Sequence, residues 1–189
     1  NWDYIMDKIK NFHNKDMRIL NLFAYTGCAT MAASLAGASE VVHVDASKGM
    51  VQWAKENAAS SGLSEAPIRW LVDDCRKFVE REIRRGNKYD GIIMDPPSYG
   101  RGSKNEVWKI EDDIFPFIEL CEQILSDDAL FFLVNSYTTG LQPAVLNYMM
   151  SIALLKNHPG TITADEIGLP VTESDLVLPC GASGRWTKN

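Results

Sequence analysis

The stretch Tyr89-Asp90-Gly91-Ile92-Ile93-Met94-Asp95-Pro96-Pro97-Ser98-Tyr99 joins an apolar segment to a stiff, acidic turn. The apolar half predicts a buried strand, so Asp95 is expected at the carboxyl edge of a sheet, where open α/β sheets bind their ligands. Pro96 and Pro97 fix their φ angles and lack amide donors, which makes the turn stiff. We expect its carbonyl groups to accept hydrogen bonds from a flat, amine-bearing ring and Tyr99 to stack on that ring. The alternative, that the prolines only end a strand, is equally supported by this stretch alone.

Apolar runs alternate with helical patterns on both sides of this stretch, which is typical of βαβ units and a mostly parallel sheet. Strands are expected at residues 18–23, 41–45, 68–72, 89–94 and 130–134, with weaker ones at 161–164 and 176–178. Helices are expected between them, one of which starts after Ser47 as its N-cap. The segment that follows the Asp-Pro-Pro turn is expected to be a polar loop. We therefore predict an α/β fold with helices on both faces of the sheet and a single domain over residues 1–189.

The composition of the chain excludes several classes of protein. With 19 Lys and Arg against 25 Asp and Glu, the formal charge is −6, so the domain does not hold nucleic acid by bulk charge. An RNA substrate therefore requires a local basic surface or one on a missing segment. No apolar run approaches the roughly 20 residues of a membrane span. The four cysteines form no CxxC pair, which favours a reducing cytoplasm and argues against a metal site. The chain begins at Asn1 without a signal-peptide pattern, and we expect an N-terminal part to be missing.

Acidic residues lie at the ends of the second, third and fourth predicted strands, as expected of a nucleoside site. Asp45 lies about eighteen residues beyond Gly27, which suits a carboxylate that accepts hydrogen bonds from both ribose hydroxyls. The first turn contains only one glycine, so it fails the G-x-G-x-x-G pattern and disfavours a dinucleotide. S-adenosylmethionine lacks a phosphate and needs fewer glycines. Each acid alone is more often a helix cap, but the series favours a cofactor. The candidate cofactor-binding residues are Phe23, Ala24, Tyr25, Thr26, Gly27, Asp45, Ala46, Ser47, Asp73, Asp74, Cys75 and Asp95.

Three motifs carry a family resemblance. They are Leu-Phe-Ala-Tyr-Thr-Gly at residues 22–27, His-Val-Asp-Ala-Ser at 43–47 and Asp-Pro-Pro-Ser-Tyr-Gly-Arg-Gly at 95–102. The chain resembles class I S-adenosylmethionine-dependent methyltransferases, in particular the bacterial 23S ribosomal RNA enzymes that modify cytosine carbon-5 or guanine nitrogen-7. The similarity extends to the terminal Arg185-Trp186 and so covers nearly the whole chain. Its motifs are specific for cofactor and fold, and much less so for substrate.

The resemblance implies a Rossmann-like, seven-stranded sheet in the order 3-2-1-4-5-7-6, with the last strand antiparallel. It also implies that the first turn, Asp45 and Asp74 hold the cofactor, while residues 95–99 face the target. Relatives usually carry an N-terminal RNA-binding extension. Two departures from the family pattern matter. Relatives often have a lysine at the Ser98 position, and carbon-5 enzymes need a cysteine in the loop after the fourth or fifth strand, where residues 97–99 and 135–137 have none.

The missing thiol shapes the expected chemistry. Carbon-5 of cytosine becomes nucleophilic only after a thiolate adds to the ring. No cysteine is expected there unless Cys180 folds back into the pocket, because Cys28, Cys75 and Cys121 lie on helical faces that suit the core. We therefore predict transfer to a nitrogen, or to an oxygen, of a ribosomal RNA base. The candidate catalytic residues are Asp95, Pro96, Pro97 and Tyr99.

Four residues near the turn are candidates for contacts with the substrate. Ser98, Arg101, Lys104 and Trp108 combine polar, basic and aromatic groups, although a solvated loop explains them equally well. Ribosomal RNA is the expected partner, with no membrane and no metal, and a homodimer is one option for the oligomeric state. Methylation of a small molecule or protein, and a cofactor- or RNA-binding domain without turnover, remain the alternative functions.

Overall fold

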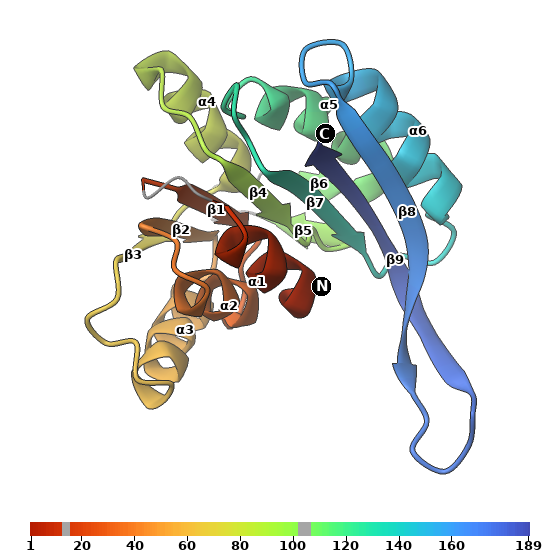
Figure 1. Ribbon diagram of the computed structural model, residues 1–189, viewed down its shortest axis with the longest axis horizontal. Coiled ribbons are helices and arrows are strands. Elements are labelled where there is room, and N and C mark those ends of the chain that lie inside the picture. Colours follow the sequence, from red (N-terminus) through yellow and green to blue (C-terminus); the bar gives the residue numbers. More distant parts are fainter. Residues whose placement is uncertain (13–15, 102–106) are drawn as a thin grey trace.

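The computed structural model describes residues 1–12, 16–101 and 107–189. Its centre is a seven-stranded sheet in the order β3-β2-β1-β4-β7-β9-β8 (Figure 1). The strands are β1 (Arg18–Leu22), β2 (Glu40–Asp45), β3 (Ile68–Val72), β4 (Gly91–Met94), β7 (Phe131–Ser136), β8 (Gly160–Pro170) and β9 (Val177–Lys188). Numbered along the chain within this sheet, they follow the predicted order 3-2-1-4-5-7-6. The first five are parallel and β9 runs antiparallel to both neighbours, which confirms the predicted fold class.

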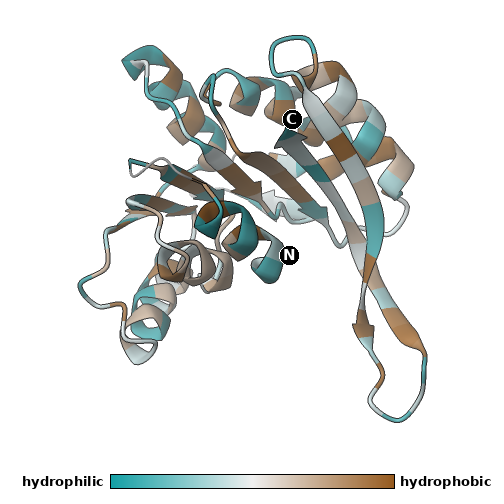
Figure 2. Cartoon of the chain, viewed as in Figure 1, coloured by the Kyte–Doolittle hydropathy of each residue, from teal (hydrophilic) through white to brown (hydrophobic). Residues whose placement is uncertain are grey.

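In the described part of the chain, six helices cover the two faces of the sheet. They are α1 (Trp2–Lys10), α2 (Cys28–Leu35), α3 (Lys48–Ser60), α4 (Cys75–Arg85), α5 (Ile110–Glu122) and α6 (Pro143–Leu154). Successive strand residues point to opposite faces, so neighbours in sequence enter different core clusters. Ile19 packs in the cluster that includes α1 and α2, whereas Leu20 packs in the one that includes α4, α5 and α6. The central strands β4 and β7 are therefore apolar along most of their length, whereas β8 and β9 are mixed (Figure 2).

Local signals placed several helix ends correctly. The Ser47 hydroxyl accepts a hydrogen bond from the Met50 amide at 3.4 Å at the start of α3. Gly86, with φ +69°, ends α4 in the left-handed conformation that glycine adopts without strain. None of the helices in the described part of the chain has the length and apolarity needed to cross a membrane.

Two segments differ from the sequence-based expectation. The predicted loop after the Asp-Pro-Pro turn contains a small antiparallel sheet of β5 (Tyr99–Arg101) and β6 (Val107–Lys109). The two weak C-terminal strands are instead eleven and twelve residues long and form an arm that projects from the body (Figure 1). Hydrogen-bonded pairing between β8 and β9 extends both strands into an exposed region. There the sequence has no regular alternation of buried and exposed residues that would predict a strand. Large apolar side chains stay exposed near the tip of the arm: Leu169, Val171, Leu176, Val177 and Leu178.

Candidate functional site

Two cavities lie at the carboxyl ends of the parallel strands, where backbone hydrogen bonds hold the strand ends together. The Asp73 amide donates to the Asp45 carbonyl at 3.0 Å, and the Asp95 amide donates to the Leu22 carbonyl at 3.4 Å. Cavity A, which includes Asp45 and Asp74 in its lining, has a volume of about 590 Å³. Cavity B, which includes Asn1 and Cys180, has a volume of about 680 Å³. Four residues line both cavities: Phe23, Tyr25, Asp95 and Tyr137.

Asp45 is the best-oriented carboxylate in cavity A. One of its oxygens accepts from the Tyr25 amide at 2.9 Å and the other from the Ser47 amide at 2.8 Å. Each carboxylate oxygen has a second lone pair, so the fixed group can still accept from a ligand. The predicted ribose-binding residue therefore has the geometry that a vicinal diol requires, with Ala46 and Ser47 beside it in the wall of the cavity.

The first turn is held in an uncommon backbone conformation. Phe23 and Tyr25 both have positive φ, at 53° and 48°, and such residues cluster at ligand sites. Gly27 has φ +87°, and a Cβ there would lie 3.1 Å from the Ala54 Cβ. Glycine is therefore required where the turn meets α3. Of the predicted turn residues, all five, Phe23 to Gly27, line cavity B, and Phe23 and Tyr25 also line cavity A.

The acidic pair after β3 separates into two roles. Asp74 lines cavity A and accepts from the Lys77 amide at 2.9 Å, so it is both an N-cap and a cavity residue. Cys75 also lines the cavity, and burial raises the pKa of its thiol, which keeps it neutral. Asp73 instead pairs with Arg81 and is not among the residues that line either cavity. The structure thus brings Asp74 and Cys75 to the site and turns Asp73 away.

Asp95 lies where the two cavities meet, and burial raises the pKa of its carboxyl group to about 6. The turn after it is fixed by Trp108, whose indole Nε1 donates to the Pro97 carbonyl at 2.7 Å. The Trp108 ring in turn packs against Phe23, with ring centroids 5.0 Å apart. The expectation that turn carbonyls serve a ligand is thus weakened at Pro97, whose carbonyl already serves the turn itself. Pro96 and Pro97 both line cavity A.

The aromatic side chain next to Asp95 is not the one expected from the sequence. Tyr99 is 52% exposed, and its hydroxyl accepts from Arg101 Nε at 3.0 Å in the small sheet. It lines neither cavity, whereas Tyr137 lines both. Burial raises the pKa of Tyr137, and the charge of Asp95 raises it further. The signal that could have identified Tyr137 is its position three residues after the strand expected at 130–134, at the same edge as Asp95.

Three of the four predicted substrate-contacting residues line cavity A. Ser98, Arg101 and Trp108 line this cavity, and the Ser98 hydroxyl lies 2.6 Å from that of Thr138. Lys104 falls outside the described residues. Among the described residues, no cluster of His, Cys, Asp and Glu is arranged to hold a metal ion.

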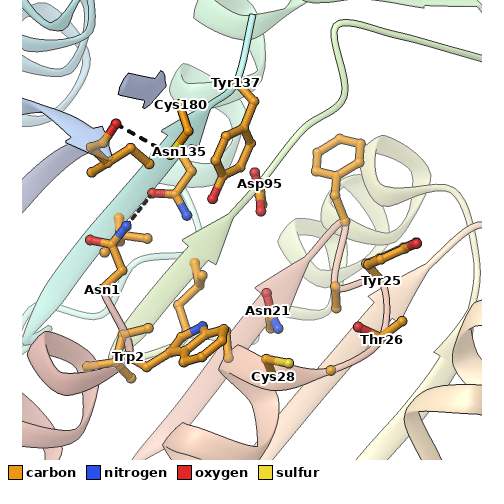
Figure 3. Close-up of a pocket in the computed structure, with 18 of the residues that line it drawn as sticks. Asn1, Trp2, Asn21, Tyr25, Thr26, Cys28, Asp95, Asn135, Tyr137 and Cys180 are labelled. Atoms are coloured by element: carbon orange, nitrogen blue, oxygen red, sulfur yellow. Dashed lines mark hydrogen bonds between the residues drawn. The ribbon is translucent and has the colours of Figure 1, made fainter. Parts of the chain in front are cut away.

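Two cysteines line cavity B: Cys28, which was expected in the core, and Cys180, which was expected there only if it folded back into the pocket. Cys28 is exposed and lines the cavity, so the expectation that it belongs to the core is wrong, whereas Cys75 and Cys121 are buried as expected. Cys180 of β9 also lines cavity B, on the same side as Tyr137 (Figure 3). Its thiol donates to the Ile167 carbonyl at 3.4 Å. Trp2 is 57% exposed and lines the same cavity.

Known proteins with similar sequences share these features of fold and motif. A family model of S-adenosylmethionine-dependent methyltransferases matches residues 8–141. A ribosomal RNA large subunit methyltransferase K/L from Shewanella frigidimarina is 37% identical over 100 residues, which cover 52% of this chain and 14% of that protein. The protein of the same name from Chromohalobacter salexigens is 40% identical over 104 residues, 54% of this chain and again 14% of its own length. The chain therefore matches only about one seventh of these curated relatives.

Solved structures agree with the same fold. The crystal structure of an S-adenosylmethionine-dependent methyltransferase from Agrobacterium tumefaciens superposes with a TM-score of 0.93 at 35% identity, covering 100% of this chain and 61% of that chain. A methyltransferase structure complexed with SAH has a TM-score of 0.71 at 21% identity, covering 97% of this chain and 48% of that chain, which supports the fold alone.

Proposed function

Because this chain belongs to the S-adenosylmethionine-dependent methyltransferases, we propose that it methylates a nitrogen of a ribosomal RNA base. The observation that carries this proposal is that Asp95 lines both cavities, between the fixed carboxylate of Asp45 and the residues after β7. In the proposed arrangement the adenosine occupies cavity A and the target base enters cavity B.

The donors and acceptors of cavity A fit the nucleoside part of the methyl donor. Asp45 would accept from the two ribose hydroxyls, because the Tyr25 and Ser47 amides hold its oxygens in place. Asp74 and the amide of Cys75 would contact the adenine edge. When bound, S-adenosylmethionine supplies an electrophilic methyl group attached to a positively charged sulfur.

Asp95 and its turn are the proposed catalytic groups. When ionised, Asp95 can accept a hydrogen bond from an exocyclic amine and stabilise the positive charge that develops on nitrogen. Ring nitrogen-7 of guanine is already nucleophilic and needs only alignment with the methyl group. Pro96 and Pro97 stiffen the turn, and the Trp108 bond holds it, so Asp95 stays aligned without reorganisation. Tyr137, rather than the predicted Tyr99, is the proposed stacking partner of the target base.

The support for an RNA target is the similarity to the large-subunit ribosomal RNA methyltransferases together with local positive charge. Arg101 and Lys109 are exposed on β5 and β6, next to the mouth of cavity A, in a chain whose net charge is −6. Such cations would contact phosphates while the base is unstacked and inserted. Four free cysteines favour a reducing compartment, and we propose that the protein acts in the cytoplasm.

A second target is favoured by one specific observation. Cys180 lines cavity B beside Tyr137, where its thiolate could add to a cytosine ring. Transfer to carbon-5 of cytosine is therefore the alternative to transfer to a nitrogen.

The test uses the protein with methyl-labelled S-adenosylmethionine and unmodified large-subunit ribosomal RNA, followed by digestion to nucleosides. Label in a nitrogen-methylated nucleoside is the expected result, and Asp95→Ala should nearly abolish it. Label in 5-methylcytidine that disappears in Cys180→Ala supports the second target. Binding of the donor without label in RNA contradicts the proposed substrate, and an extract fraction that becomes labelled instead points to a small molecule or protein.

A further inference from the structure

A hydrogen-bonded chain of side chains crosses the wall of cavity B and ends at Asn135. Asn1 Oδ1 accepts from two nitrogens of Arg185, at 2.6 Å and 3.1 Å. Asn1 Nδ2 then donates to Asn135 Oδ1 at 2.9 Å. Asn1 lies at the start of α1, Arg185 on β9 and Asn135 on β7, so three elements distant in sequence meet here (Figure 3 shows Asn1 and Asn135).

The chemistry of these groups fixes the direction of every bond in the chain. A guanidinium group carries five N–H donors and no acceptor, so Arg185 requires an oxygen of Asn1 to face it. The amide nitrogen of Asn1 must then face Asn135. A donor in that position requires the oxygen of Asn135, which leaves the Asn135 amide nitrogen pointing into cavity B.

Asn135 therefore presents an unused donor to the cavity. Asn135 is 7% exposed. Within the described part of the chain, the Asn135 Nδ2 has no hydrogen-bond partner. In Figure 3 this nitrogen points away from Asn1, toward the side of the cavity where Tyr137 and Asp95 lie. Asn135 Nδ2 is not among the buried unpaired atoms of the described residues, so this nitrogen is open to the cavity, where a ligand that supplies an acceptor can reach it.

We propose that Asn135 determines the specificity of the target base, by donating to an acceptor atom that lies beside the group held by Asp95. This inference rests on the proposed function. The ionised Asp95 carboxylate accepts, and the Asn135 amide donates, so the pair fits a nucleobase edge with a donor next to an acceptor. Edges of this kind include the amine and ring nitrogen of cytosine or adenine, and N1–H with O6 of guanine. Arg185 is a positioning residue that acts through Asn1.

The first test compares two substitutions at Asn135 with a matched control. Asn135→Ala removes the donor and should lower kcat/KM for the RNA about tenfold, the effect of one lost hydrogen bond. Asn135→Asp should lower it about a hundredfold, because a second carboxylate then faces Asp95 where a donor is needed. Asn147→Asp introduces the same charge on α6, at a residue that lines neither cavity, and should stay within twofold of the unaltered protein.

The readouts are methyl transfer to unmodified large-subunit ribosomal RNA, donor affinity by calorimetry, and thermal unfolding to confirm folding. Donor affinity should stay within threefold in every variant. If both Asn135 variants fold and keep kcat/KM within threefold, or if they weaken donor affinity instead of RNA turnover, the inference is overturned. If the unaltered protein binds the donor and transfers no methyl group to RNA, the proposed function fails and this inference fails with it.

The role of Arg185 has its own test. Arg185→Lys keeps a group that only donates and should retain near-normal turnover, whereas Arg185→Met frees the two amides to rotate and should lower kcat/KM about fivefold. In the double variant with Asn135→Ala, the Arg185→Met effect on turnover should disappear, because no donor is left to orient. An effect of the same size in the double variant overturns the positioning role and indicates a general structural one.

Discussion

At the scale of single residues, Asp95 is a carboxylate held where burial opposes its charge. Burial raises its pKa to about 6, so the free protein gains this negative charge only as the pH rises through that value. A sulfonium in the adjoining cavity favours the ionised form. We expect affinity for S-adenosylmethionine to increase between pH 5 and pH 7 and then level off. S-adenosylhomocysteine, with a neutral sulfur, should show a smaller dependence in calorimetric titrations. Equal pH dependence for both ligands would contradict a role of Asp95 next to the sulfur.

The same residue should cost stability in the free protein. A raised carboxyl pKa means that the folded state binds the proton more tightly, so its contribution to stability is complete below the unfolded value near 3.8 and is lost as the pH rises through 6. Asp95→Asn keeps the shape without the charge. We expect it to raise the free energy of unfolding by about 3 kcal/mol at pH 7.5 and by little at pH 4, since each pKa unit corresponds to about 1.4 kcal/mol.

Urea denaturation at the two pH values measures this difference, with turnover measured alongside. A variant that is more stable and nearly inactive supports a functional origin for the buried charge. If Asp95→Asn and the unaltered protein are equally stable at both pH values, or if the variant is less stable at pH 7.5, the carboxylate is better solvated or better hydrogen-bonded than its burial indicates.

The site residues that could be predicted from the sequence are those that lie at the end of a strand or directly after it. Asp45, Asp74 and Asp95 were found in this way, since parallel strands place their carboxyl ends at one edge. Asp73 is an exception because Arg81, nearly two turns into α4, attracts its carboxylate away from the cavity. Asn135 was not identified as a cavity residue, and Cys180 was expected there only if it folded back into the pocket. The position of Cys180 depends on how the distant strand β9 pairs with the sheet, which no local pattern encodes.

At the scale of elements, the β5–β6 sheet converts a polar segment into a support for the catalytic turn. Its pairing places Trp108 opposite Gly100, with the indole Nε1 bonded to the Pro97 carbonyl. Trp108→Phe preserves much of the packing against Phe23 and removes only the donor. We expect kcat to fall about fivefold, the effect of one neutral hydrogen bond, because the turn that holds Asp95 loosens. Single-turnover rates with saturating donor measure this effect.

A matched control is Tyr148→Phe, which removes a polar group from an aromatic side chain that is 69% exposed on α6. Its rate should match that of the unaltered protein. If Trp108→Phe also matches, the bond to Pro97 does not limit catalysis and the rigidity of the two prolines is sufficient.

The elements themselves were predicted unequally well. Helices α3 and α4 carry caps and apolar periodicity in their own sequences, so their bounds could be expected closely. The small sheet and the long arm are stabilised by pairing between segments, and their exposed residues show no alternation of apolar and polar side chains to indicate a strand. Both were therefore predicted as loop or as short strands.

At the scale of the whole molecule, one sheet serves both core clusters, since adjacent residues of the same strand belong to opposite faces. We therefore propose that residues 1–189 unfold as a single unit and show one calorimetric transition.

Gly160→Ala tests this proposal at the far edge of the sheet. Its Cβ would lie 2.4 Å from both the Thr187 carbonyl oxygen and the Trp186 Nε1, so the start of β8 must shift. We expect the one transition to remain and the free energy of unfolding to fall by about 2 kcal/mol. Leu176→Ser, at a tip residue that is 71% exposed, should leave both unchanged. A second transition in Gly160→Ala would instead mean that the arm and its edge of the sheet unfold independently of the methyltransferase core.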